Sequence, residues 1–171
     1  MNKINKDFQR DGKSPLRYHL RYARPEDLQQ MNSVCRVSKA HWGYDDNFLE
    51  KAHCELRVPL TLVLSNQVMV ADNGKEIIAV GGIENEADDT FTVSHLYVDP
   101  NFMGQGIGAA IFAGLSALAS GLGGQLLSIV SDPNAVVFYE KMGASVVGEE
   151  KSASETGRVL PLMHLPLVKD G

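Results

Sequence analysis

Three glycines at every second position, Gly104, Gly106 and Gly108, form the stretch with the clearest chemistry in this sequence. An apolar pattern at helical spacing begins among them at Ile107. A helix that starts in glycines presents its first backbone N–H groups with little side-chain bulk around them. Those groups also carry the positive end of the helix dipole. The stretch therefore predicts an anion site of the kind that binds phosphate.

Two common phosphate motifs do not fit this stretch. A P-loop has Lys and Ser or Thr after its last glycine, where this chain has Ala109 and Ala110. The dinucleotide fingerprint G-x-G-x-x-G fails because Ile111 follows Ala110 where the third glycine belongs. A relaxed dinucleotide site stays open, since Asp132 follows about one strand–helix unit later, where an acid could bind a ribose. A tight turn without a ligand also stays open.

The residues around the glycines resemble the acyl-CoA motif of the GNAT N-acetyltransferase superfamily. That motif is carried here by Leu96-Tyr97-Val98, Asp99-Pro100 and Gly104-x-Gly106-x-Gly108. About thirty residues later, a second stretch is similar to the family's other cofactor motif: Asp132-Pro133-Asn134-Ala135, Phe138-Tyr139 and Met142-Gly143-Ala144. The resemblance covers roughly residues 21–167. One departure is Met103, where the family usually has Gln or Arg.

The resemblance implies acetyl-CoA as cosubstrate. Its pyrophosphate would lie on the backbone N–H groups of Met103, Gly104, Gln105, Gly106, Ile107, Gly108 and Ala109. Its pantetheine arm would pair with the backbone of Leu96, Tyr97 and Val98, and would also contact Asn134 and Phe138. The N–H of Val98 would point at the acetyl carbonyl. Because most of these contacts are made by backbone, the side chain of Met103 does not decide binding.

Proton transfer needs an acid for the departing thiolate and a base for the amine. The resemblance places Tyr139 as the general acid, although its helical stripe also fits a core aromatic. Glu84, at the predicted end of a strand, is the candidate general base, and the alternative is a solvated rim charge. His95 is a second candidate that would also face the substrate, unless it is a histidine satisfied within the sheet.

The acceptor site is expected near an aromatic-rich turn and the last polar loop. His41, Trp42 and Tyr44 could wall it, or could plug a hydrophobic turn. Arg158 could bind a substrate carboxylate, or could be exposed. The sequence has no Ser-His-Asp or Cys-His arrangement with supporting context, and no metal-ligand spacing. We therefore expect direct transfer without a covalent acyl-enzyme and without a metal.

Composition limits the class of protein. The net charge of −5 argues against nonspecific nucleic-acid binding. Lys and Arg are absent between Lys75 and Lys141 while acids are frequent there, so the surroundings would suit a positively charged amine. No secretory signal or membrane-spanning run is present, which predicts a cytoplasmic protein, and a homodimer is left open. Cys35 fits a helix face and predicts a buried thiol; Cys54 completes no framework.

The elements that would position these residues follow from periodicity and turn signals. The Asn73-Gly74 pair predicts a hairpin. The expected strands are residues 16–23, 67–71, 76–83, 91–98, 126–130, 145–150 and 160–167. Helices are expected over 24–40 and 46–57, from 107 to about 120 and over 132–142, with a capping box at Asn47 and Glu50 in the second. The strand–helix–strand unit around the glycines predicts a parallel crossover.

These elements predict an α/β (α+β) fold of one domain, residues 17–168, after an N-terminal tail, residues 1–16. The resemblance implies the GNAT fold: a mixed sheet of six to seven strands, splayed after Val98, with helices on both faces. It implies an acetyl-CoA-dependent N-acetyltransferase acting on a primary amine of a small molecule or peptide. The alternatives are a catalytically silent acyl-CoA-binding regulatory module and a dinucleotide-binding oxidoreductase domain.

Overall fold

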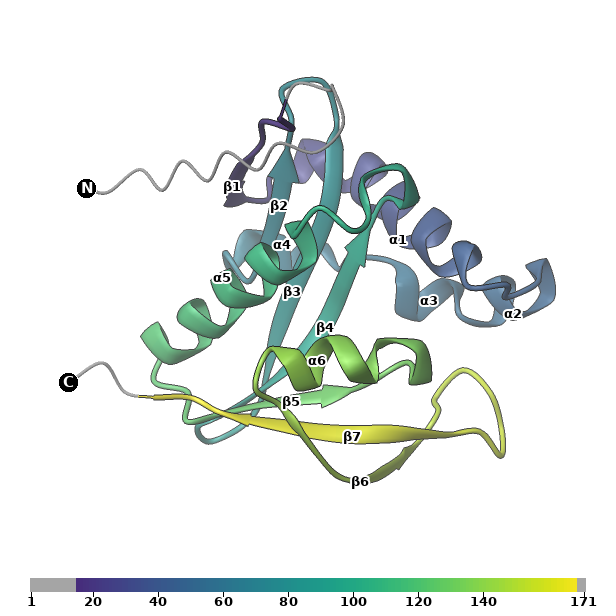
Figure 1. The fold of residues 1–171 in the computed structure, drawn as a ribbon, viewed down its shortest axis with the longest axis vertical. Helices are drawn as coiled ribbons and strands as arrows, with labels where there is room; N and C mark the ends of the chain where they lie inside the picture. Colours follow the sequence, from purple (N-terminus) through teal and green to yellow (C-terminus); the bar gives the residue numbers. More distant parts are fainter. Residues whose placement is uncertain (1–14, 169–171) are drawn as a thin grey trace.

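A computed structural model describes residues 15–168 and shows one mixed seven-stranded sheet (Figure 1). The strands lie in the order β1-β2-β3-β4-β5-β7-β6. Their bounds are β1 His19–Tyr22, β2 Val68–Asp72, β3 Ile77–Ala87, β4 Thr90–Val98, β5 Leu126–Val130, β6 Ser145–Lys151 and β7 Val159–Pro166. Only β4 and β5 pair in parallel among the described strands. The predicted mixed sheet and parallel crossover are confirmed.

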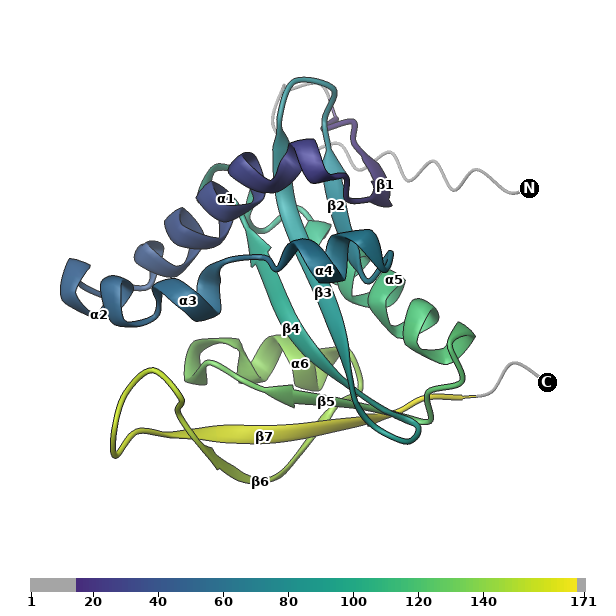
Figure 2. The same ribbon diagram turned by 180° about the vertical axis from the view of Figure 1, so that it is seen from behind.

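Helices cover both faces of this sheet. The α-helices are α1 Leu28–His41, α2 Asp46–Lys51, α3 His53–Leu56, α4 Leu60–Leu64, α5 Ile107–Gly121 and α6 Val136–Lys141. Short 3-10 turns lie at η1 Pro25–Asp27, η2 Pro100–Phe102 and η3 Pro133–Ala135. Helices α5 and α6 lie on the face seen in Figure 1, and α1 to α4 on the face seen in Figure 2. Within residues 15–168, no helix has the length and apolar character to cross a membrane.

Each face of the sheet has its own core. Helix α5 buries Ile107, Ile111 and Leu115, one turn apart, in the first core. Helix α1 contributes Met31 and Cys35 to the second. Cys35 is buried as predicted, and burial raises the pKa of its thiol to about 12. The central strand β3 serves both cores, and this double burial explains its continuous apolar run.

A glycine on β3 lets α5 approach the sheet closely. A Cβ atom on Gly81 would collide with Cγ2 of Ile111 and lie 3.0 Å from Cδ1 of Leu115. These two side chains occupy the space that any larger residue would need. The position of α5, and with it the position of the glycine turn before it, therefore depends on Gly81.

Several local predictions need correction. The helix expected over residues 46–57 breaks at Ala52 into α2 and α3, and its N-cap is Asp45, whose carboxylate accepts from the N–H of Phe48. The expected cap at Asn47 is therefore wrong. Helix α4 was not predicted, because its five residues are too few for a periodic signal. Strand β3 runs to Ala87, so Glu84 lies within the strand and not at its end.

The expected start of the domain at residue 17 lies close to the first described residue, residue 15. Residues 1–14 of the predicted tail lie outside the described residues. Leu16, which was also assigned to the tail, packs against the core that contains α5. The folded part therefore includes residues slightly before the expected start at residue 17.

Arg21 connects the first strand to two carboxylates, and this predicts acid-sensitive stability. Its guanidinium binds Asp27 through two nitrogens at 2.8 and 3.0 Å and reaches Asp72 at 3.0 Å. The hydrogen bond from Arg21 lowers the pKa of Asp27. The pKa of Asp72 is lowered first by the N–H of Gly74 and then by Arg21. A carboxylate with a lowered folded pKa stabilises the protein above its unfolded pKa, and this contribution disappears as pH falls through the folded pKa.

We expect Arg21→Met to lower the free energy of unfolding by about 2 kcal/mol at pH 7, because Asp27 is left with an uncompensated, nearly buried charge. The difference from the wild type should shrink below about pH 4, where the carboxylates become protonated. Urea unfolding at pH 7 and pH 3 measures both values. An equal loss at the two pH values would contradict the assignment to these ion pairs.

Candidate functional site

The sheet opens between β4 and β5. These strands pair only from Thr90 to Thr92, opposite Leu126 to Ser128. Beyond this point β4 stays paired with β3 as far as Val98, while β5 pairs with β7, so the two strands diverge (Figure 1). The expected splay after Val98 is therefore wrong, since the two strands already diverge after Thr92. As a result, residues 93–98 form a free strand edge.

The backbone of this free edge presents hydrogen-bonding groups. The N–H of Asp99 donates to the carbonyl of Ile78 on the β3 side, at 2.9 Å. Because successive peptide groups of a strand point to opposite sides, the N–H of Val98 points toward the open side. An extended ligand could pair with this edge as an added strand would.

The glycine turn lies directly after the open edge. Gly104 and Gly106 have φ of 76° and 79°, a conformation that glycine adopts without strain. Within the described residues, no acceptor pairs with the backbone N–H groups of residues 104–109, and the first hydrogen bond of α5 runs from Ala110 to Gly106. A Cβ on Gly108 would lie 3.5 Å from Cγ2 of Val98 and 3.6 Å from the ring of Phe138. The turn, the strand end and α6 therefore meet.

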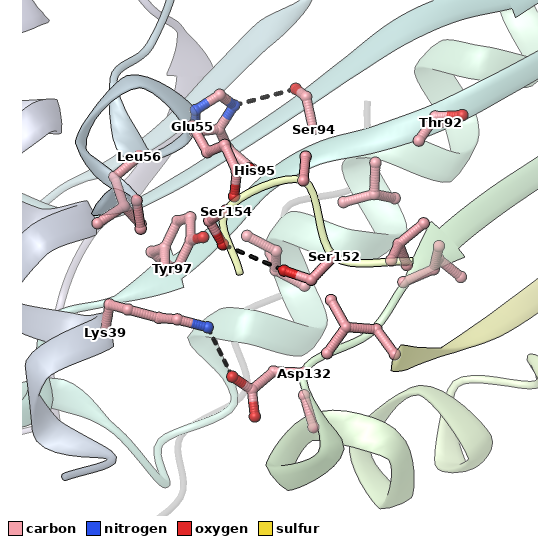
Figure 3. Close-up of a pocket in the computed structure, with 18 of the residues that line it drawn as sticks. Lys39, Glu55, Leu56, Thr92, Ser94, His95, Tyr97, Asp132, Ser152 and Ser154 are labelled. Carbon is pink, nitrogen blue, oxygen red and sulfur yellow. Dashed lines mark hydrogen bonds and ion pairs between the residues drawn. The ribbon is translucent and has the colours of Figure 1, made fainter. Parts of the chain in front are cut away.

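A cavity of about 630 Å³ lies in the opening of the sheet (Figure 3). Residues from β4, β5, α1, α3, α6 and the loop between β6 and β7 line it. Among the predicted site residues, its wall contains Trp42, Glu84, His95, Leu96, Tyr97, Asn134, Tyr139 and Arg158. The glycine turn itself, residues 103–109, lies outside the wall. Val98 and Phe138 also lie outside the wall, beside this turn. His41 and Tyr44 also lie outside it.

Tyr139 belongs both to the core and to this cavity. Its residue is 6% exposed, and its ring packs against Phe138 and Phe112 with centroids 5.1 and 5.4 Å away. Burial raises the pKa of its phenol, which therefore stays protonated at neutral pH. No other residue in the range 15–168 makes a hydrogen bond with this hydroxyl. The core and the catalytic interpretations are thus compatible, because a packed ring can hold its hydroxyl at the wall.

The two candidate bases differ in environment. Glu84 is exposed on β3, and its carboxylate has no ion-pair partner within residues 15–168. His95 is buried, with 4% of its surface exposed, and both of its ring nitrogens have partners. Burial lowers the pKa of His95, and backbone carbonyls of Arg57 and Glu55 oppose this shift only partly. Of the two candidates that line the cavity, Glu84 is therefore the one that is exposed to solvent.

A polar cluster that we call the latch lies at the cavity wall and consists of Lys39, Tyr44, Asp132 and Arg158. All of these residues except Tyr44 line the cavity. Oδ2 of Asp132 accepts from Lys39 Nζ at 2.6 Å and from the Tyr44 hydroxyl at 2.8 Å (Figure 3 shows the Lys39 pair). Arg158 in turn donates to the Tyr44 oxygen at 2.5 Å. The latch joins α1, the turn before α2, the end of β5 and the β6–β7 loop.

Asp132 also organises the start of α6. Its Oδ1 accepts from both the backbone N–H and the side-chain amide of Asn134, each at 2.9 Å. Burial works to raise the pKa of Asp132, but the hydrogen bonds from Lys39, Asn134 and Tyr44 outweigh burial and hold this pKa below its ordinary value. One carboxylate thus ties the latch to a predicted cofactor residue.

The charge of the cavity departs from the sequence expectation of acidic surroundings. Its wall holds the acids Glu55, Glu84, Asp132 and Glu150 together with the cations Lys39, Arg57, Lys151 and Arg158. The cations come from α1, the C-cap of α3, the end of β6 and the β6–β7 loop. These segments lie outside the cation-free interval of the sequence, but they line the same cavity as residues from that interval. Sequence reasoning missed Lys39, Ser94 and Glu55, because no motif marks them.

Comparison with known families places these features. A sequence model of the acetyltransferase (GNAT) domain matches residues 47–158. The chain belongs to this family. It is an acetyltransferase, and the family expected from the sequence is confirmed. Comparison with curated protein sequences gave no match.

Solved structures of GNAT enzymes share the fold. The PaiA N-acetyltransferase of Thermoplasma acidophilum, in complex with coenzyme A, is 18% identical over 88% of this chain and 99% of its own, with a TM-score of 0.71. The ribosomal-protein-S18-alanine N-acetyltransferase of Escherichia coli is 17% identical over 91% and 97%, with a TM-score of 0.66. A GNAT acetyltransferase of Brucella melitensis, in complex with acetyl-CoA, is 16% identical over 90% of each chain, with a TM-score of 0.64.

Proposed function

We propose that this GNAT acetyltransferase transfers the acetyl group of acetyl-CoA directly to a primary amine of a small molecule or peptide. The observation that carries the proposal is the free edge of β4 from Val93 to Val98, followed directly by the glycine turn, whose N–H groups have no partner within residues 15–168. A thioester ligand with a long arm and a pyrophosphate needs both features in this order. The cavity that this edge borders would take the amine.

The chain's own residues would hold the cosubstrate mainly through backbone. The N–H groups of residues 104–109 and the dipole of α5 would bind its pyrophosphate, with Met103 at the start of the turn. Leu96 and Val98 would pair with its arm along the free edge, with Asn134 and Phe138 on the opposite side. The outward N–H of Val98 would stabilise negative charge on the acetyl oxygen.

Bound acetyl-CoA supplies a thioester, whose acetyl carbon bonds to the amine nitrogen while the sulfur leaves. Tyr139 would then donate its phenolic proton to the departing sulfur, since burial keeps the phenol protonated. Glu84 would accept the amine proton, either directly or through water, because its carboxylate is exposed at the cavity and has no cationic partner in the described part of the chain. Trp42 and Arg158, which line the cavity, would contact the acceptor.

Ligand-dependent unfolding tests the cosubstrate. Acetyl-CoA at a hundredfold its dissociation constant should raise the free energy of unfolding by about 2.7 kcal/mol. NAD at the same concentration serves as the control, because it shares the pyrophosphate but lacks the arm that pairs with β4. We expect stabilisation by acetyl-CoA and by CoA, and none by NAD. Stabilisation by NAD alone would overturn the proposal.

A further inference from the structure

Strand β4 carries a bulge in the wall of the cavity. Gly82 of β3 pairs with His95, and the next residue, Ile83, pairs with Val93, so Ser94 has no residue opposite it. A bulge bends the strand and turns side chains away from the regular alternation. Here it brings the side chains of Ser94 and His95 together, with Ser94 Oγ 3.1 Å from His95 Nδ1 (Figure 3).

Glycine on the neighbouring strand makes room for this pair. A Cβ atom on Gly82 would lie 2.8 Å from Ser94 Oγ and 3.6 Å from His95 Nδ1. The hydroxyl therefore occupies the space that a side chain at residue 82 would fill. Gly82 on β3 and His95 on β4 thus define the position of the Ser94 hydroxyl.

The hydrogen bonds of His95 fix the direction of the Ser94 proton. His95 Nε2 lies 3.1 Å from the backbone oxygen of Arg57, which can only accept, so Nε2 carries a hydrogen. Since burial lowers the pKa of His95, its ring is neutral near pH 7, and Nδ1 is then the acceptor. The Ser94 hydroxyl must donate to Nδ1. Its remaining lone pairs are therefore the groups that it offers to the cavity, which it lines.

We propose that Ser94 Oγ accepts a hydrogen bond from an N–H of the acceptor and so holds the acceptor in the cavity, with His95 as the positioning residue. The inference rests on the proposed function. Ser94 follows Val93, where the free edge of β4 begins, and it lines the cavity that this edge borders, so an acceptor bound in the cavity can reach its hydroxyl. Ser94 forms no bond to the acetyl group. The site would favour amines that keep an N–H to donate over tertiary amines, which have none when neutral.

Kinetics of variants at this pair test the proposal. Ser94→Ala should lower kcat/KM for the amine about tenfold, which is the worth of one hydrogen bond, with an unchanged dissociation constant for acetyl-CoA. His95→Leu removes the acceptor of the Ser94 proton and should cost about as much. The double variant should lose no more than either single variant, because both act through one hydroxyl. His95→Asn, whose amide oxygen lies near the position of Nδ1, should keep most of the activity.

Ser65→Ala is the matched control, because this hydroxyl caps α4 away from the cavity and donates to the Thr61 carbonyl. It should leave kcat/KM unchanged. Wild-type activity in Ser94→Ala, or additive losses in the double variant, would overturn the Ser94 role alone. A wild-type chain that acetylates no amine would overturn both this role and the proposed function. An acetyl group found on Ser94 by peptide mass spectrometry would also overturn it, since the step would then be covalent.

Discussion

Tyr139→Phe is expected to lower kcat by about a hundredfold while leaving the dissociation constant of acetyl-CoA unchanged. The change removes only the phenolic oxygen, and general acid catalysis typically contributes at least this factor. The ring contacts with Phe112 and Phe138 remain, so the fold should be retained. Steady-state thiol release gives kcat, and isothermal titration gives the affinity.

Tyr22→Phe provides the control for this variant, because Tyr22 is a half-exposed tyrosine on β1 outside the cavity wall. It should leave kcat unchanged. A Tyr139→Phe variant with wild-type kcat would show that Tyr139 serves the core only. A variant with lower acetyl-CoA affinity and unchanged kcat would instead assign the hydroxyl to binding.

Asp132→Ala should lower the free energy of unfolding by about 3 kcal/mol, because its carboxylate has more partners than any other group of the latch. Its loss leaves the Lys39 ammonium, with 15% of its side chain exposed, without its anion. It also removes the hydrogen bonds that hold Asn134 at the start of α6. Urea unfolding at pH 7 measures the change.

A paired variant separates the two parts of this loss. Lys39→Met added to Asp132→Ala removes the uncompensated charge and should recover about half of the stability. The part of the free energy of unfolding that is not recovered is then due to the lost hydrogen bonds between Asp132 and Asn134 at the start of α6. A loss below about 0.5 kcal/mol in Asp132→Ala would contradict the latch, because surface ion pairs are worth that little.

The elements that could be predicted from the sequence are those set by local signals. The turn at Asn73-Gly74, the glycines before α5 and the Asp132-Pro133 start of η3 all occur where expected, because backbone conformation at these places depends on the residues themselves. By contrast, the order of the last strands, with β7 between β5 and β6, depends on long-range pairing that no local pattern encodes.

The candidate site likewise contains residues that have a local sequence signal and residues that have none. The glycine turn and Tyr139 were found because each belongs to a stretch with its own spacing. Lys39 and Arg158 reach the cavity from helices and loops distant in sequence, so their joint contacts with Tyr44 had no signal. The Ser94 bulge had none either, since it arises from the register between β3 and β4.

Turnover with a panel of amines tests the central claim most directly. The protein is incubated with acetyl-CoA and amino acids, polyamines or peptides with free amino groups, while thiol release and the masses of acceptor and protein are followed. Direct transfer to an amine predicts amine-dependent thiol release, an acceptor that gains one acetyl group, and a protein whose mass stays constant. Bound acetyl-CoA that no amine consumes, or an acetyl group that remains on the protein, would contradict it.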